Sequence, residues 1–453
     1  MRTSVLARRW RHLWKSTRSL RVTQRRDLSG GGGDDRWPSP WGQPWTASTL
    51  TNFMNHLLLL RGGTAAPPLD RCEITCGDLH DDDDYNLPAR YKHKLDKDLN
   101  RAAGLWIHHA VAACHARVLR VRLLARRRLR LDGRSFAAGA PFLTTVALKK
   151  ARLTESSLDF SGCPALQDLT VRSCNIQAER ICSPSLAHLR IDECSFHAET
   201  RTRVSSPRLV SLRMTVSSGS APVLESMPEL VYPNVRIEDW SRDMCSHNVC
   251  INSGYIKKKR GHGSKDGCFC VDEDGSGTYL EDLTCCDSCY GCEDGSSVLL
   301  EGLSGATDLD LISDPRVFIF RNDCKSPTTL FNSLKTLLLN KWCMAVDFGA
   351  LVFFLQRSPI LEELTLQLGY CETRRTVVET DKSYSPTELF VVSKQLTTVE
   401  IKCTEEDEIV KMLLVLLTTN GVHQDQIHIE HDFCPPDLSG YDTNNSDYDD
   451  YDW

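Results

Sequence analysis

The chain has 453 residues, of which 41% are hydrophobic and 25% are charged, and its formal net charge is −6. These values are ordinary for a soluble globular protein, and the length allows two to four folded units. No apolar run approaches the roughly 18–20 residues that span a bilayer. The basic N-terminus also lacks the apolar stretch of a secretory signal. We therefore expect no membrane association and a cytoplasmic or nuclear protein whose 20 cysteines are reduced.

Two helical patterns precede the main part of the chain. Residues 3–14 are predicted to form an amphipathic helix, because four large apolar side chains recur on one face and Thr3 can cap its start. Residues 102–114 are predicted to form a second helix. Between them, residues 23–104 are predicted to be a linker and an N-terminal cap region, with a glycine-rich stretch at 30–33.

A repeated frame begins at Pro164, Pro184 and Pro207. Each copy reads P-x-L-x-x-L-x-Φ, where Φ is aliphatic, and successive copies start 20 and 23 residues apart. This period is typical of leucine-rich repeats. The L-x-Φ pair places two apolar side chains on one face of a short strand, while a stack of repeats shares one core. A later copy starts at Pro359. The predicted repeat-core residues are Leu166, Leu169, Val171, Leu186, Leu189, Ile191, Leu209, Leu212, Met214, Leu361, Leu364 and Leu366.

Weaker copies of the frame extend the array. They occupy residues 118–123, 143–148, 334–339 and 396–401. Phe348 to Leu355 follows a helical spacing, with Asp347 placed to cap it and Pro359 beyond its end. The predicted fold class is therefore α/β. It is a leucine-rich-repeat solenoid over residues 105–403, in which short parallel strands alternate with helices or irregular segments.

The C-terminal part is predicted to close the array. A helix carrying Ile409, Met412, Leu413, Leu416 and Leu417 is stopped by an Asn-Gly pair, and residues 426–429 return as a strand. Residues 404–434 form this capping unit in our interpretation. Residues 435–453 are acidic, and we predict a disordered tail.

A cluster of eight cysteines interrupts the array within an insertion at about residues 241–296. Cys286-x-x-Cys289-x-x-Cys292 has the spacing of metal ligands, and a structural zinc site is one interpretation. The other is an insertion whose thiols are free. Cys268-x-Cys270 is tighter than the usual zinc knuckle and the segment is rich in Gly, Asp and Ser, so we predict no metal. A calcium loop starting at Asp272 fails because its twelfth position is Leu283.

Catalytic and cofactor-binding motifs were sought and not found. The sequence has no H-E-x-x-H, G-x-S-x-G or phosphate-binding G-x-x-x-x-G-K-[ST] motif. His108 and His109 are adjacent and point to different sides of a helix, which disfavours a metal pair. The arginines at 126–130 favour a solvated strand face over nucleic acid. We predict that the chain is not an enzyme, needs no cofactor and does not bind nucleic acid.

The sequence resembles plant, specifically grass-type, F-box/leucine-rich-repeat proteins. Residues 2–14 are similar to the second half of an F-box, and residues 105–107 with 116–121 resemble the family's entry into its repeats. Residues 303–309 and 334–343 resemble further family segments, while 396–429 are similar to the C-terminal FBD-type unit. A family F-box begins before the matching segment, so residues 1–22 are predicted to be a partial F-box truncated on its N-terminal side.

The resemblance implies a substrate receptor of a Skp–cullin–F-box ubiquitin ligase. In that family the F-box binds a Skp-type adaptor, which joins a cullin, and the repeats hold the protein to be ubiquitinated. The residues that match the F-box pattern, as its core or its adaptor contacts, are Val5, Leu6, Trp10, Leu13 and Trp14. The alternative is a stand-alone protein-binding scaffold that has lost adaptor binding because the F-box is incomplete.

Overall fold

The computed structural model falls into two compact units, which are described separately below. The first comprises residues 1–214 and 227–229, and the second comprises 215–226 and 230–453. The structure describes residues 17–23, 55, 68–76, 101–123, 130–131, 136, 139–154, 158–238, 240–243, 297–315, 317–326, 328–344, 348–368, 390–404 and 408–431. The predicted F-box helix, the cysteine cluster and the acidic tail lie outside these residues.

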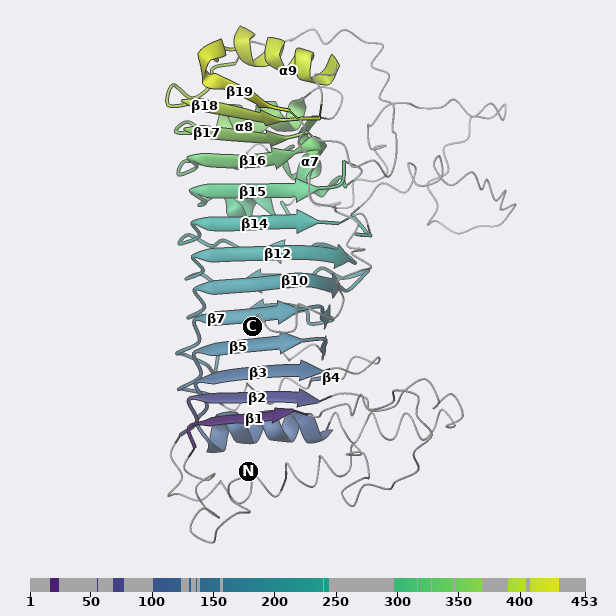
Figure 1. Ribbon diagram of the computed structural model, residues 1–453, viewed down its shortest axis with the longest axis vertical. Helices are drawn as coiled ribbons and strands as arrows, with labels where there is room; N and C mark the ends of the chain where they lie inside the picture. Colours follow the sequence, from purple (N-terminus) through teal and green to yellow (C-terminus); the bar gives the residue numbers. More distant parts are fainter. Residues whose placement is uncertain are drawn as a thin grey trace, which may run out of the picture. The chain divides into compact units, whose positions relative to one another are not determined.

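Each unit is α/β and is built on a parallel sheet of several strands with few helices (Figure 1). The main strands of the first unit lie in the order β1 (Ser19–Thr23), β2 (Arg71–Cys76), β3 (Val118–Leu123), β5 (Thr145–Lys149), β7 (Asp168–Arg172) and β10 (His188–Phe196). Shorter strands pair in the segments between them: β4 (Arg130–Leu131), β6 (Arg152–Leu153) and β8 (Asn175–Ile176), and also β9 (Arg180–Cys182) with β11 (Arg203–Ser205). Strand β12 (Ser211–Ser218) begins in the first unit.

The sequence frame coincides with the register of these strands. Leu189 and Ile191 of β10 lie opposite Leu169 and Val171 of β7, so one repeat of the frame corresponds to one step across the sheet. Because side chains alternate along a strand, both members of each pair enter the core. All twelve residues predicted as the repeat core are buried.

A turn with a positive φ recurs directly after β5 and β7, and also within β10. Lys150, Ser173 and Glu193 each adopt a positive φ, of 59°, 49° and 52°. The residue after each turn is small and buried, and in two repeats it is a cysteine. The thiol of Cys174 donates to the carbonyl of Leu148 at 3.6 Å, and that of Cys194 donates to the carbonyl of Val171 at 3.4 Å. Each cysteine therefore contacts the strand of the preceding repeat.

The weak copy predicted at residues 118–123 coincides with strand β3. In this strand Leu119 lies opposite Val146 and Val121 lies opposite Leu148. Ala116 takes the place of the leucine that starts the frame, and it is buried.

Strands β1 and β2 were missed by the sequence analysis. Leu69, Cys72 and Ile74 are buried and occupy the three apolar positions of the frame. Pro67 stands two residues before Leu69, as in the stronger copies. This copy escaped notice because a cysteine replaces the second leucine.

The strands of the second unit also run parallel. Their order is β14 (Tyr232–Ile237), β15 (Asp308–Ser313), β16 (Thr336–Asn340), β17 (Glu363–Gln367), β18 (Thr398–Lys402) and β19 (Ile427–Glu430). The described helices and the remaining short strand are β13 (Val223–Leu224), α6 (Leu300–Leu303), α7 (Ile319–Asp323), η6 (Lys341–Met344), α8 (Gly349–Arg357), α9 (Glu408–Thr419) and η7 (Gln424–Gln426). Gly302 of α6 packs so close to residue 224 that an added Cβ would lie 2.6 Å from the Leu224 carbonyl oxygen.

The two C-terminal helices follow the predictions closely. Helix α8 begins at Gly349, after Phe348 in a left-handed conformation with φ 50°, and it ends before Pro359. Helix α9 ends where the Asn420 side chain donates to the Leu416 carbonyl at 2.8 Å and Gly421 takes a φ of 96°. Its apolar face differs from the expected one in that Val410 is buried. Ile409 and Met412 are half-buried.

The first unit also contains a helix at the predicted position. Residues 101–108 are α-helical, and the π-helical turn η4 (His109–Ala113) continues them. Trp106, Ile107 and Ala110 are buried along this helix. The helix therefore contributes a full apolar face to the core of the first unit.

Candidate protein-binding faces

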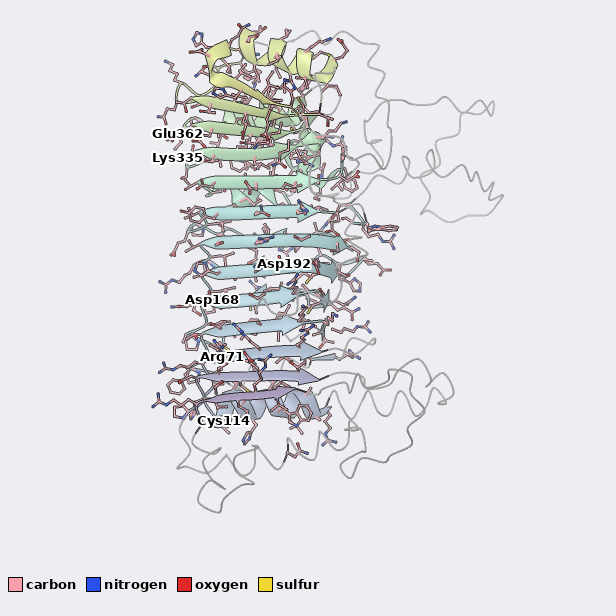
Figure 2. The ribbon with its side chains drawn as sticks, in the orientation of Figure 1. Arg71, Cys114, Asp168, Asp192, Lys335 and Glu362 are labelled. Atoms are coloured by element: carbon pink, nitrogen blue, oxygen red, sulfur yellow. The ribbon has the colours of Figure 1, made fainter. Side chains whose placement is uncertain are left out.

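The side of each sheet opposite the core carries the polar residues of the strands. In the first unit this side is rich in cations, and we call it the basic face. Its eight basic residues and three acidic residues alternate with the buried apolar positions. The basic residues are Arg21, Arg71, Arg120, Arg122, Lys149, Arg172, Arg190 and Arg213, and the acidic residues are Glu73, Asp168 and Asp192. Figure 2 labels Arg71, Asp168 and Asp192 on these strands.

Three arginines from neighbouring strands surround Glu73. The Glu73 carboxylate lies 3.4 Å from Arg21 of β1, 3.8 Å from Arg71 of β2 and 3.4 Å from Arg120 of β3. The parallel register brings these together, since Arg21 and Arg120 lie directly opposite Glu73 on either side. We call this group the Glu73 cluster. It carries more positive than negative charge.

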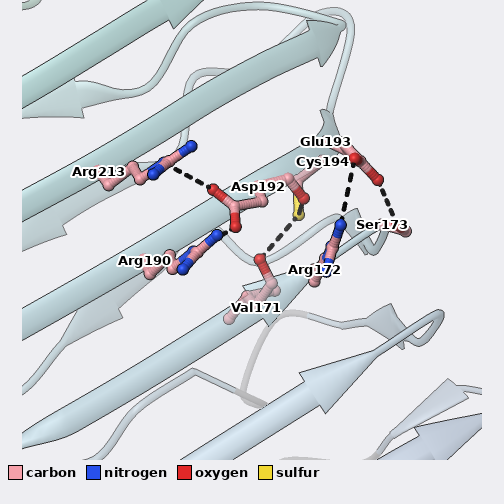
Figure 3. Close-up of polar contacts among 8 residues, drawn as sticks. All are labelled: Val171, Arg172, Ser173, Arg190, Asp192, Glu193, Cys194 and Arg213. Atoms are coloured by element: carbon pink, nitrogen blue, oxygen red, sulfur yellow. Dashed lines mark hydrogen bonds and ion pairs between the residues drawn. The ribbon is translucent and has the colours of Figure 1, made fainter. Parts of the chain in front are cut away.

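A second cluster forms around Asp192 in the middle of β10 (Figure 3). Arg190 Nε donates to the Asp192 carboxylate, and Arg213 Nε lies 3.5 Å from its other oxygen. We call these three residues the Asp192 cluster. Beside them, Glu193 lies 3.7 Å from Arg172 and accepts a hydrogen bond from the Ser173 hydroxyl at 2.8 Å.

The corresponding face of the second unit has the opposite balance. Its five acidic residues, Asp308, Asp310, Glu363, Glu400 and Glu430, stand against the basic residues Arg236 and Lys402. Lys402 lies 3.2 Å from Glu400 and 2.9 Å from Glu430, and both carboxylates raise its pKa. Burial raises the pKa of Asp310, although Asn234 donates to it at 2.8 Å. Nearer one end of the strands, Lys335 and Glu362 form an ion pair at 2.9 Å.

In the part of the chain that the structure describes, no group of three or more His, Cys, Asp or Glu side chains could hold a metal ion. The buried thiol of Cys194 is a poor nucleophile, because burial raises its pKa well above the usual range. Among the described residues, no helix is both long and apolar enough to cross a membrane. Both faces present charged side chains on successive strands, at the regular spacing of the sheet.

Cys182 allows a test of local electrostatics in the first unit. Burial and the hydrogen bond that its thiol donates to Asp159, at 3.1 Å, raise its pKa to about 11. At pH 8 the thiolate fraction is then roughly 100-fold below that of an ordinary thiol with a pKa near 9. We predict that iodoacetamide labels Cys182 about 100-fold more slowly than glutathione in the same tube, as measured by mass spectrometry of the Cys182 peptide. The rate should climb about tenfold per pH unit up to pH 10.

The Asp159→Asn variant is the control for this prediction, because it removes the charge and leaves a side chain of the same size. We expect it to lower the pKa of Cys182 and to speed labelling at pH 8. A labelling rate in the wild type that levels off above pH 9 would contradict the assigned pKa.

The sequence frame accounts for part of the basic face. In L-x-Φ the middle residue points away from the core, so the frame places Arg190 and Arg213 on the exposed side, and the structure has them there. The frame missed the Glu73 cluster, since two of the cluster's three strands were not recognised. The five predicted F-box residues, Val5, Leu6, Trp10, Leu13 and Trp14, lie outside the described residues, so the structure brings none of them to a site.

Comparison with known proteins returned no matching family model, curated protein or solved structure.

Proposed function

We propose that this chain is a substrate receptor of a Skp–cullin–F-box ubiquitin ligase. It binds a target protein through the exposed side of a leucine-rich-repeat solenoid. It binds a Skp-type adaptor through the helix predicted at residues 3–14. The receptor needs no catalytic residue, because holding a target close to a loaded ubiquitin-conjugating enzyme raises the effective concentration of its lysines.

The observation that carries the proposal is the agreement between the repeated frame and the strand register. Copies of P-x-L-x-x-L-x-Φ lie in step across parallel strands, and in the copies at Pro164 and Pro184 a residue with positive φ precedes a buried cysteine. An array of this kind turns its apolar residues inward and leaves polar side chains of successive strands in rows. Such rows are well suited to binding another protein.

The adaptor half of the proposal is supported by the sequence. Residues 2–14 resemble an F-box, and Leu6, Trp10 and Leu13 recur with the spacing of one helical face. An amphipathic helix of this kind can lay its apolar side into a groove of a partner.

Co-purification with a Skp-type adaptor tests the proposal. The full chain, co-expressed with the adaptor, is expected to retain it through affinity and size-exclusion steps. Trp10→Ala should lose most of the adaptor. Trp240→Ala should retain it, because Trp240 is an exposed tryptophan far along the sequence from the F-box segment. A folded chain that never retains the adaptor would exclude the ligase role. A stand-alone protein-binding scaffold would then be the better description.

A further inference from the structure

We propose that the basic face of the first unit binds an extended acidic segment of a partner protein, whose carboxylates occupy the Glu73 and Asp192 clusters. This inference rests on the proposed function in one respect only, namely that the exposed sheet side of the chain holds a protein. It adds the chemistry of that protein and the spacing of its charges.

In both clusters the arginines are more exposed than the carboxylate that they share. In the Glu73 cluster the carboxylate is only 17% exposed, whereas Arg21 is 75%, Arg71 is 50% and Arg120 is 25% exposed. In the Asp192 cluster the carboxylate is 9% exposed, whereas Arg190 is 48% and Arg213 is 60% exposed. The acids therefore lie beneath the arginines and position them, while the guanidinium groups form the outer surface.

The arginines of each cluster carry more hydrogen-bond donors than its carboxylate has acceptor positions. A guanidinium carries about five N–H donors, and a carboxylate offers about four acceptor positions. Arg21 and Arg71 alone carry more donors than Glu73 accepts. Arg190 and Arg213 carry more donors than Asp192 accepts. Arginine donors in this arrangement favour a second carboxylate, which they bind with charge-assisted hydrogen bonds. An incoming acid therefore completes a cluster that one internal acid has already ordered.

The distance between the two clusters sets the spacing of the acidic residues that could bind them. Glu73 lies on β2 and Asp192 lies on β10, four strands further along the sheet of the first unit. At about 4.8 Å per strand the separation is roughly 19 Å, which an extended chain covers in about six residues. The face therefore fits a segment that crosses the strands with acidic residues about six positions apart.

The residues between the clusters favour a protein over a nucleic acid. Asp168 of β7 lies on the basic face between them, close to Thr145, whose hydroxyl donates to it at 3.3 Å. Exposed Glu193 lies beside the Asp192 cluster. A nucleic acid carries a phosphate at every nucleotide, so its phosphates would lie beside these carboxylates and be repelled by them. A polypeptide can place neutral residues there.

A synthetic peptide tests this inference on the full chain. The probe is fluorescein-labelled Glu-Glu-Ser-Gly-Ser-Gly-Glu-Glu, whose acidic pairs match the spacing, and binding is followed by fluorescence anisotropy. Arg71→Gln and Arg213→Gln each remove one arginine, and each leaves the cluster's carboxylate with a partner. We expect each single variant to weaken binding about tenfold and the double variant about 100-fold. Arg208→Gln is the control, because this exposed arginine lies in the turn before β12 and makes the same change in charge. It should leave binding unchanged.

Two results would overturn the inference. One is equal binding of the peptide to the wild type and to the double variant, when thermal unfolding shows that both proteins are folded. The other is tighter binding of single-stranded DNA of equal charge that is also lost in the double variant, since it would assign the face to nucleic acid. Adaptor retention is measured on the same preparations. An acidic probe that fails to bind a chain that still retains the adaptor refutes this inference alone, while loss of the adaptor with intact peptide binding refutes the ligase role alone.

Discussion

Replacing Asp323 with alanine is expected to lower the free energy of unfolding of the second unit by about 3–5 kcal/mol. The Asp323 carboxylate is buried at the end of α7. It accepts hydrogen bonds from the backbone N–H groups of Val298, Leu299 and Leu300, at 3.0, 2.6 and 2.9 Å, and from the Ser297 hydroxyl at 3.0 Å. The residue before α6 supplies no side-chain cap, so Asp323 provides the acceptor for the start of this helix. Alanine would leave three buried N–H donors without a partner.

Urea unfolding and amide hydrogen exchange together measure this effect. The peptide that spans residues 298–300 should lose its protection in Asp323→Ala. Asp308→Ala is the matched control, because Asp308 lies half-buried on the polar side of β15 and caps no helix. Its effect should stay below about 1 kcal/mol. Similar losses in the two variants would show that the carboxylate does not hold the start of α6.

A second large effect is expected for Leu169→Ala in the first unit. Leu169 is buried between strands at the repeat position that the frame predicts, opposite Val146 on one side and Leu189 on the other. Removing most of the side chain leaves a cavity that neighbouring strands cannot fill without shifting. We expect a loss of about 3 kcal/mol, within the range for buried leucines.

Thr170→Ala distinguishes burial from a general sensitivity of the strand. Thr170 is the next residue of β7 and points to the basic face. Its substitution should cost less than about 1 kcal/mol. The two chemical denaturation curves are compared at the same pH and salt. If the two variants were equally unstable, the division of β7 into a core side and an exposed side would be contradicted.

The fold was predictable wherever the repeat kept its leucines. The copies at Pro164, Pro184 and Pro207 gave the correct strands and the correct buried residues. The copy at Pro67 was missed because Cys72 stands where the second leucine of the frame was expected. The copy in β14 starts at Leu230 and was missed because Pro233 stands at its second leucine position. In both cases the later aliphatic residue, Ile74 or Val235, is still buried. A strand can therefore contribute to the core without a leucine at the second position of the sequence frame.

The charged clusters could not be predicted in the same way. Glu73 meets Arg21 and Arg120 from strands about 50 residues away in each direction, and only the register determines which side chains lie opposite. The segments that connect these strands vary in length and carry no frame. Asp323 has the same difficulty, because its partners at residues 298–300 lie in a different element. Long-range polar contacts depend on how the strands align, and the copies of the frame in β1 and β2 are too degenerate to show that alignment in the sequence.

The most direct test of the central claim is ubiquitin transfer in a reconstituted system. Purified chain is mixed with a Skp-type adaptor, a cullin with its RING partner, the activating and conjugating enzymes, and ubiquitin. A receptor held in this assembly places its own lysines near the loaded enzyme, so the account predicts ubiquitin on this chain only when the adaptor and the cullin are both present. The Trp10→Ala variant should remain unmodified and Trp240→Ala should be modified as the wild type is. Modification that is independent of the adaptor, or its absence from a folded chain in the complete mixture, would contradict the receptor role.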